Sequence, residues 1–156
     1  MRVQSVLWIF VFVLACAHGA LAKDIALVSH KDNAAKNMPL SDLVKICKGQ
    51  TGRWPDGRLL TLITRDPASS DMHVVLQKVY GMSPEEVADL IASANHDRTD
   101  RPAIVVVNSD ELVVKRVEST PGAVGLVDVY SITSGVNVLR VGGKLPLEPG
   151  YPLHGN

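Results

Sequence analysis

The sequence of 156 residues has few aromatic residues, only two cysteines and no excess of charge of either sign. Aromatic residues make up 4% of the chain, which leaves little material for stacking the bases of a single-stranded nucleic acid. The 16 Lys and Arg residues balance 16 Asp and Glu residues, whereas a nucleic-acid-binding domain normally carries a basic excess. We therefore expect no nucleic-acid partner.

Residue patterns typical of enzymes are also missing from the sequence. The five histidines are scattered, and no two of them have the i, i+3 or i, i+4 spacing of metal ligands on a helix. The chain has no Gly-x-Ser-x-Gly elbow, no P-loop and no Gly-x-Gly-x-x-Gly dinucleotide motif. We expect a protein that is not an enzyme and that needs no metal ion or cofactor.

Residues 1–22 have the pattern of a secretory signal peptide. Arg2 supplies the positive start, Val6 to Ala15 form an apolar run, and Ala20-Leu21-Ala22 resembles a cleavage site. Cleavage after Ala22 would leave 156 − 22 = 134 residues and predicts a periplasmic protein. In a competing interpretation, the loose lipoprotein box that ends at Cys16 would anchor the chain through a lipid on that cysteine.

Cleavage after Ala22 removes Cys16 and leaves Cys47 as the single cysteine, so no intramolecular disulfide can form. Cys47 lies in an apolar stretch with helical spacing. A small buried hydrophobic residue is therefore a better interpretation of Cys47 than a reactive thiol.

Short apolar runs alternate with amphipathic stretches over residues 23–141. We expect strands at 24–28, 59–64, 103–107, 124–129 and 136–141, and helices at 41–48, 71–80, from Pro84 and after Ser109. This order predicts an α/β domain of three layers with a mostly parallel sheet. The continuous apolar run at 103–107 predicts a strand that is covered on both faces.

Polar residues at helix starts and a Gly/Pro-rich end complete the expected organisation. Ser41 is expected to cap the first helix, and Ser83 with Glu86 forms a capping box. Residues 142–156 contain three prolines and four glycines, so we expect this tail to be loosely ordered.

The most informative strand-to-helix junction contains Arg65, Ser69 and Ser70. A fixed positive charge, two hydroxyls and the free N–H groups of a helix start are the parts of a small-oxyanion site. Asp66 or Asp71 could accept the proton of an ion such as hydrogen phosphate, whereas either carboxylate would repel unprotonated sulfate. The same residues also fit an ordinary helix cap with a surface ion pair.

The order of these segments resembles the phosphate-binding-protein-like domain of ABC phosphate importers, in a short single-lobe form. The resemblance covers about residues 24–141. It is carried by Leu40-Ser41-Asp42-Leu43, Ile46-Cys47-Lys48-Gly49, Arg53-Trp54-Pro55-Asp56-Gly57, Arg65-Asp66 before Ser69-Ser70, Tyr80-Gly81-Met82-Ser83-Pro84, Arg101-Pro102, Ser109-Asp110 and residues 120–128.

The resemblance implies one lobe of a periplasmic-binding-protein fold and an oxyanion loop formed by Arg65, Ser69, Ser70 and Asp71. It implies phosphate or a similar oxyanion as ligand, and a membrane transporter or another periplasmic protein as partner. Asp71 stands where the family has a threonine, and 134 residues leave no room for a second lobe of equal size. These departures keep open an alternative, an interaction or assembly module that retains the fold without the ligand.

Overall fold

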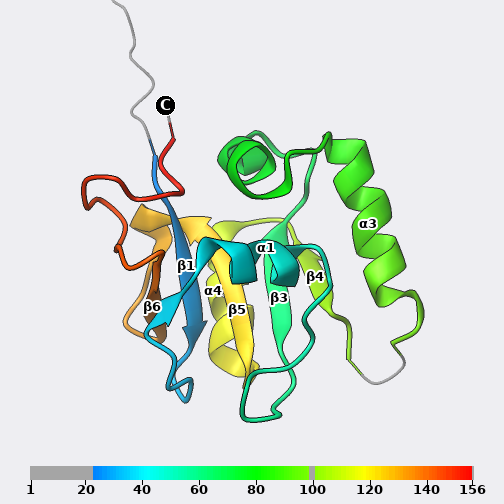
Figure 1. The fold of residues 1–156 in the computed structure, drawn as a ribbon, viewed down its shortest axis with the longest axis horizontal. Helices are drawn as coiled ribbons and strands as arrows, with labels where there is room; N and C mark the ends of the chain where they lie inside the picture. The colour runs from blue at the N-terminus through cyan, green and yellow to red at the C-terminus, as the bar shows by residue number, and fades with distance from the viewer. Residues whose placement is uncertain (1–22, 99–100, 156) are drawn as a thin grey trace, which may run out of the picture.

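The computed structural model describes residues 23–98 and 101–155 (Figure 1). The predicted signal peptide and the alternative of a lipid on Cys16 lie outside these residues. None of the helices within the described ranges is both long and apolar enough to cross a membrane.

A six-stranded sheet in the order β2-β6-β1-β5-β3-β4 forms the centre of the fold. The pairs β2–β6, β5–β3 and β3–β4 are parallel, and β1 is antiparallel to both of its neighbours. Within the described chain, β1 alone runs against the other strands, which confirms a mostly parallel sheet. The strands are β1 Ile25–His30, β2 Asn37–Met38, β3 Thr61–Arg65, β4 Ile104–Val107, β5 Ala123–Asp128 and β6 Val136–Val141.

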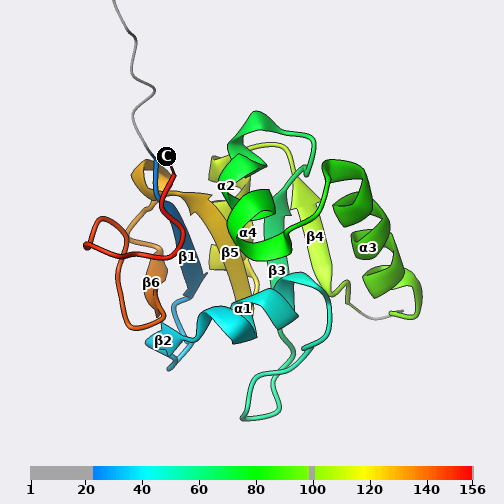
Figure 2. The same ribbon diagram turned by 45° about the horizontal axis from the view of Figure 1, so that its top comes forward.

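Helices cover both faces of the sheet, as the three-layer prediction requires (Figures 1 and 2). On one face, α4 packs Val113 and Val117 against the sheet. On the other face, residues of α1, α3 and a helical segment over 70–80 join the larger core cluster. The helices are α1 Leu40–Cys47, α2 His73–Val75, α3 Pro84–His96 and α4 Asp110–Ser119, with η1 Ser70–Met72, η2 Leu76–Tyr80 and η3 Val129–Ser131.

The helix over residues 71–80 is confirmed, but it changes its winding along its length. It begins as the 3₁₀ turn η1, continues as α2 and ends as the π-type turn η2. Gly81 ends it with φ +61°, a conformation that glycine adopts without steric cost.

Two local predictions at helix and strand ends need correction. Ser41 does not cap α1: the N-cap position is Pro39, without a side-chain hydrogen bond, and Ser41 lies inside the helix. The strand at 103–107 is not covered on both faces. It is the edge strand β4, in which Val106 is 41% exposed. The capping box of Ser83 and Glu86 is present as expected.

The expectation of a loosely ordered tail is wrong for residues 142–155, because this segment packs into the core. Tyr151 and Leu153 are 4% and 0% exposed, and the Tyr151 hydroxyl donates to the carbonyl oxygen of Ile25 at 2.7 Å. The buried carboxylate of Asp24 accepts from the N–H of Leu147 and contacts Nδ1 of His154 at 2.5 Å. The segment thus holds the start of β1 in place.

Cys47 is a buried hydrophobic residue, as expected. Its side chain is 0% exposed, and burial raises the pKa of the thiol to about 12. The Tyr80 hydroxyl donates to the Cys47 carbonyl oxygen at 3.1 Å and ties η2 to α1.

Candidate functional site

The carboxyl ends of the parallel strands β3, β4 and β5 lie side by side at one end of the sheet and bring three charged residues together. Arg65 is the last residue of β3, Asp128 is the last residue of β5, and Asp110 begins the helix that follows β4. Parallel strands end at the same edge, and ligands of α/β proteins bind beyond such ends. The sheet topology therefore selects this edge as the candidate site.

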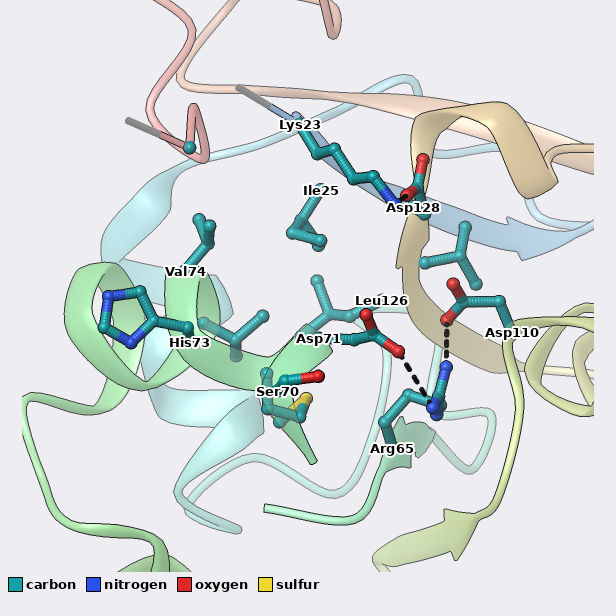
Figure 3. A pocket seen from close by; sticks show the side chains of 14 residues that line it. Lys23, Ile25, Arg65, Ser70, Asp71, His73, Val74, Asp110, Leu126 and Asp128 are labelled. Atoms are coloured by element: carbon teal, nitrogen blue, oxygen red, sulfur yellow. Dashed lines mark ion pairs between the residues drawn. The ribbon is translucent and has the colours of Figure 1, made fainter. Parts of the chain in front are cut away.

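Arg65 is the centre of the charged cluster (Figure 3). Its Nη2 lies 3.0 Å from Oδ2 of Asp71, and its Nη1 lies 3.2 Å from Oδ1 of Asp110. The Arg65 and Asp110 side chains are about 15% exposed, whereas Asp71 is 49% exposed. Arg65 Nε is buried and has no hydrogen-bond partner among the described residues. The guanidinium is therefore firmly positioned, but one of its donors is unsatisfied.

The loop after β3 places the first helical turn beside Arg65. The Asp66 carboxylate accepts from the N–H of Ala68 at 2.9 Å and closes a tight turn. The Ser69 hydroxyl then caps η1 by accepting from the N–H of Asp71 at 3.3 Å, and it also accepts from Arg65 Nη2 at 3.4 Å. As a result, Ser70 and Asp71 line the pocket beside Arg65.

A second ion pair lies across the pocket. Lys23 Nζ is 3.0 Å from Oδ2 of Asp128, and the other oxygen of Asp128 accepts from the N–H of Tyr130. The hydrogen bond and the charge of Asp128 raise the pKa of Lys23 above its ordinary value, with smaller contributions from the charges of Asp71 and Asp110. Lys23 therefore remains cationic at neutral pH.

These residues surround a pocket of about 240 Å³. Its charged lining residues are the two cations Lys23 and Arg65 and the three carboxylates Asp71, Asp110 and Asp128, a formal sum of −1. The N–H groups at the starts of η1 and α4 partly offset this negative sum. Ser70, His73 and Gly155 also line the pocket. The apolar side chains of the lining are Ile25, Met72, Val74, Val75, Leu126 and Val127.

The structure brings all four sequence-predicted site residues together, and three of them, Arg65, Ser70 and Asp71, line the pocket. Ser69 contacts Arg65 from outside that lining. Of the two carboxylates considered as proton acceptors, Asp71 lines the pocket and Asp66 does not.

Sequence reasoning missed three charged residues of the pocket: Lys23, Asp110 and Asp128. The rule that ligands bind at the carboxyl ends of parallel strands would have selected Asp110 and Asp128, which lie at or just beyond such ends. Lys23 precedes β1, the strand that runs the other way, so the rule gives no signal for it. Within residues 23–98 and 101–155, no group of three or more His, Cys, Asp or Glu side chains could hold a metal ion.

Neither the family models nor the curated proteins include a match to this chain. Solved structures do match. An ABC-type phosphate transport receptor from Vibrio cholerae superposes with a TM-score of 0.69 at 19% identity, over 86% of this chain and 54% of the receptor. PstS from Borrelia burgdorferi gives 0.66 at 18% identity, over 86% and 55%. A putative phosphate ABC transporter substrate-binding protein with bound phosphate, from Clostridium perfringens, gives 0.63 at 18% identity, over 78% and 46%.

The resemblance inferred from the sequence is confirmed at the level of the fold. The chain spans about half the length of these solved structures, as a single-lobe form would. The fold of this chain is therefore the fold of about half of a phosphate ABC transporter substrate-binding protein.

Proposed function

We propose that this chain is an exported protein of the solute-binding type and that it binds phosphate or a similar oxyanion at Arg65. The observation that carries the proposal is the Arg65 guanidinium, held at the carboxyl end of β3 on the wall of a pocket. Residues 1–22 supply the export signal in this proposal. The fold shared with phosphate-transport proteins supports a binding role rather than catalysis.

The site would exchange one internal ion pair for the ligand. Asp71 is the more exposed of the two carboxylates on Arg65, so it is the one that an incoming anion displaces most easily. Arg65 would then hold two ligand oxygens, which suits the fork of guanidinium donors. Ser70 would donate a hydrogen bond, and Asp71 would accept the ligand's proton. Sulfate has no proton to offer near neutral pH and would be rejected.

Isothermal titration of phosphate and then sulfate into the protein, in phosphate-free buffer, tests this proposal. We expect saturable heat with phosphate and none with sulfate. Arg65→Ala should abolish the phosphate signal while the circular dichroism spectrum stays unchanged. Arg58→Ala is the matched control, because it removes another arginine that is paired with an aspartate, here Asp56 at 2.8 Å, away from the pocket. Wild-type affinity in Arg65→Ala would refute the assigned site.

A second candidate is an interaction or assembly module that keeps the fold without a small ligand. It is favoured by the two carboxylates that already occupy the terminal nitrogens of Arg65 and by the formal pocket charge of −1. This alternative predicts no heat with either anion. It predicts instead a discrete complex with a membrane transporter, with another periplasmic protein or with a second copy, detected by light scattering after size exclusion.

A further inference from the structure

We infer that the pocket at Arg65 is built for an oxyanion that carries a short apolar substituent: a phosphomonoester or an alkylphosphonate rather than inorganic phosphate. This inference rests on the proposed function and narrows its ligand class. It follows from the uneven distribution of polar and apolar groups around the pocket.

Several charged groups of the pocket gather on one side, and a partly buried valine lies on the other. In Figure 3, Asp71, Arg65, Asp110 and Asp128 gather on one side, and Val74 lies with His73 on the other. Val74 is only partly buried: it packs against the core and also lines the pocket. One part of the pocket thus offers ionic partners, and the other offers hydrocarbon.

Hydrogen-bond donors are concentrated on the charged side as well. Arg65 and Lys23 carry side-chain donors there, and Ser70 adds a hydroxyl in the middle of the pocket, whereas Val74 on the apolar side carries none. Among the described residues on that apolar side, His73 is the one with a side-chain donor, and the residue is exposed.

Inorganic phosphate has four oxygens, and an oxygen that faces the apolar wall would lose its hydrogen bonds to water without gaining a donor. A carbon substituent at that position needs no donor and removes apolar surface from water. Each buried methylene strengthens binding by about fourfold. The apolar wall therefore favours a substituted oxyanion over the unsubstituted ion.

The pocket has one more carboxylate than it has cations, and this limits the ligand to a phosphoryl group with one carbon substituent. The Asp71 carboxylate can accept a hydrogen bond from the ligand only if a ligand oxygen carries a proton; otherwise Asp71 repels the ligand. A monoester or a phosphonate retains an ionisable oxygen that can carry this proton, whereas a diester does not. The ligand class is therefore a singly substituted phosphoryl group with a short uncharged chain.

Titration calorimetry with phosphate, methyl, ethyl and propyl phosphate, and dimethyl phosphate tests this inference. We expect affinity to rise about fourfold for each added methylene until the chain reaches solvent, and dimethyl phosphate to bind least. Val74→Ser should remove this gain, so that propyl phosphate binds the variant no more tightly than methyl phosphate does. Val44→Ser is the matched control: it changes another partly buried helix valine that packs on the same core but lies outside the pocket.

The outcomes separate this inference from the proposed function. A rising series that Val74→Ser flattens and Val44→Ser leaves intact supports the inference. Binding of inorganic phosphate as tightly as the esters would overturn the inference and leave the proposed function standing. Absence of binding for every phosphoryl compound, from a folded protein, would refute both.

Discussion

At the scale of single residues, Gly122 fixes the turn that leads into β5. Its φ is +81°, and a Cβ at this position would lie 2.1 Å from the carbonyl oxygen of Leu59. The Gly122 carbonyl oxygen also accepts from Nε1 of Trp54 at 2.9 Å, so the turn anchors the buried indole. Trp54 is 8% exposed and packs in the main core cluster. A side chain at Gly122 would collide with the Leu59 carbonyl oxygen and disturb the hydrogen bond from Trp54.

We expect Gly122→Ala to lower the free energy of unfolding by about 1–3 kcal/mol more than Gly57→Ala does, measured by urea denaturation. Gly57 has a similar φ of +87°, but a Cβ there would meet no atom within 4 Å. The two variants therefore share the cost of a positive φ, and only Gly122→Ala adds a backbone collision. Equal losses in the two variants would show that the turn adjusts freely.

The Cys47 thiol provides a prediction of pH dependence. Burial raises its pKa from 9.0 to about 12, so the thiolate is about a thousandfold scarcer at pH 8 than in an exposed cysteine. We expect alkylation of Cys47 in the native protein, followed by mass spectrometry of the peptide that contains it, to be correspondingly slow. The rate should rise with pH without reaching a plateau by pH 10, and urea should accelerate it strongly. Rapid labelling at pH 8 without denaturant would contradict this burial.

Some residues of the candidate site could be predicted from the sequence, and others could not. Arg65, Ser70 and Asp71 could be predicted because they lie in one short loop. Residues so close in the sequence are also close in space, whatever the order of the strands. Asp110 and Asp128 lie 45 and 63 residues beyond Arg65 in the sequence. Their proximity depends on the order of β4, β3 and β5 in the sheet. Periodicity predicts the strands but leaves their order undetermined.

At the scale of elements, β4 illustrates how an apolar run can mislead. Four apolar residues suit a central strand, yet β4 lies at the edge of the sheet. The exposed edge is partly closed by Asn95, whose side-chain amide donates to the Ile104 carbonyl oxygen at 2.8 Å and whose oxygen accepts from the Ile104 N–H at 3.1 Å. One side chain of α3 thus pairs with the strand as a neighbouring strand would. This is one way to protect an edge.

We expect Asn95→Ala to lower the free energy of unfolding by about 1–2 kcal/mol, because it leaves a backbone donor and a backbone acceptor without partners. Amide hydrogen exchange at Ile104 should accelerate in the same variant. Asn137→Ala is the control, because its amide makes a single exposed hydrogen bond to the carbonyl oxygen of Lys31. A loss in Asn95→Ala no greater than in the control would show that the edge does not need this closure.

At the scale of the whole molecule, the two ends of the described chain lock together. The N–H of Ile25 donates to the carbonyl oxygen of Leu153 at 3.0 Å, and the N–H of Gly155 donates to that of Lys23 at 3.0 Å. Composition alone suggested a loose tail, because proline and glycine dominate it. The structure uses those residues to bend the segment, while Tyr151 and Leu153 provide its buried contacts. Lys23 and Gly155 both line the pocket, so this lock also shapes the candidate site.

The tail should therefore unfold together with the sheet rather than before it. Leu153 is 0% exposed, and truncation of its side chain would leave a cavity in the main core. We expect Leu153→Ala to cost about 2–5 kcal/mol in free energy of unfolding. Leu147→Ala, in the same segment but 66% exposed, should stay within about 0.5 kcal/mol of the wild type. Urea denaturation followed by far-UV circular dichroism measures both. If Leu153→Ala were as mild as Leu147→Ala, the tail would be an appendage. A large loss of unfolding free energy in Leu153→Ala, with a single transition, would show that residues 142–155 unfold together with the sheet. The segment would then be part of the folded domain and would support the pocket that Lys23 and Gly155 line.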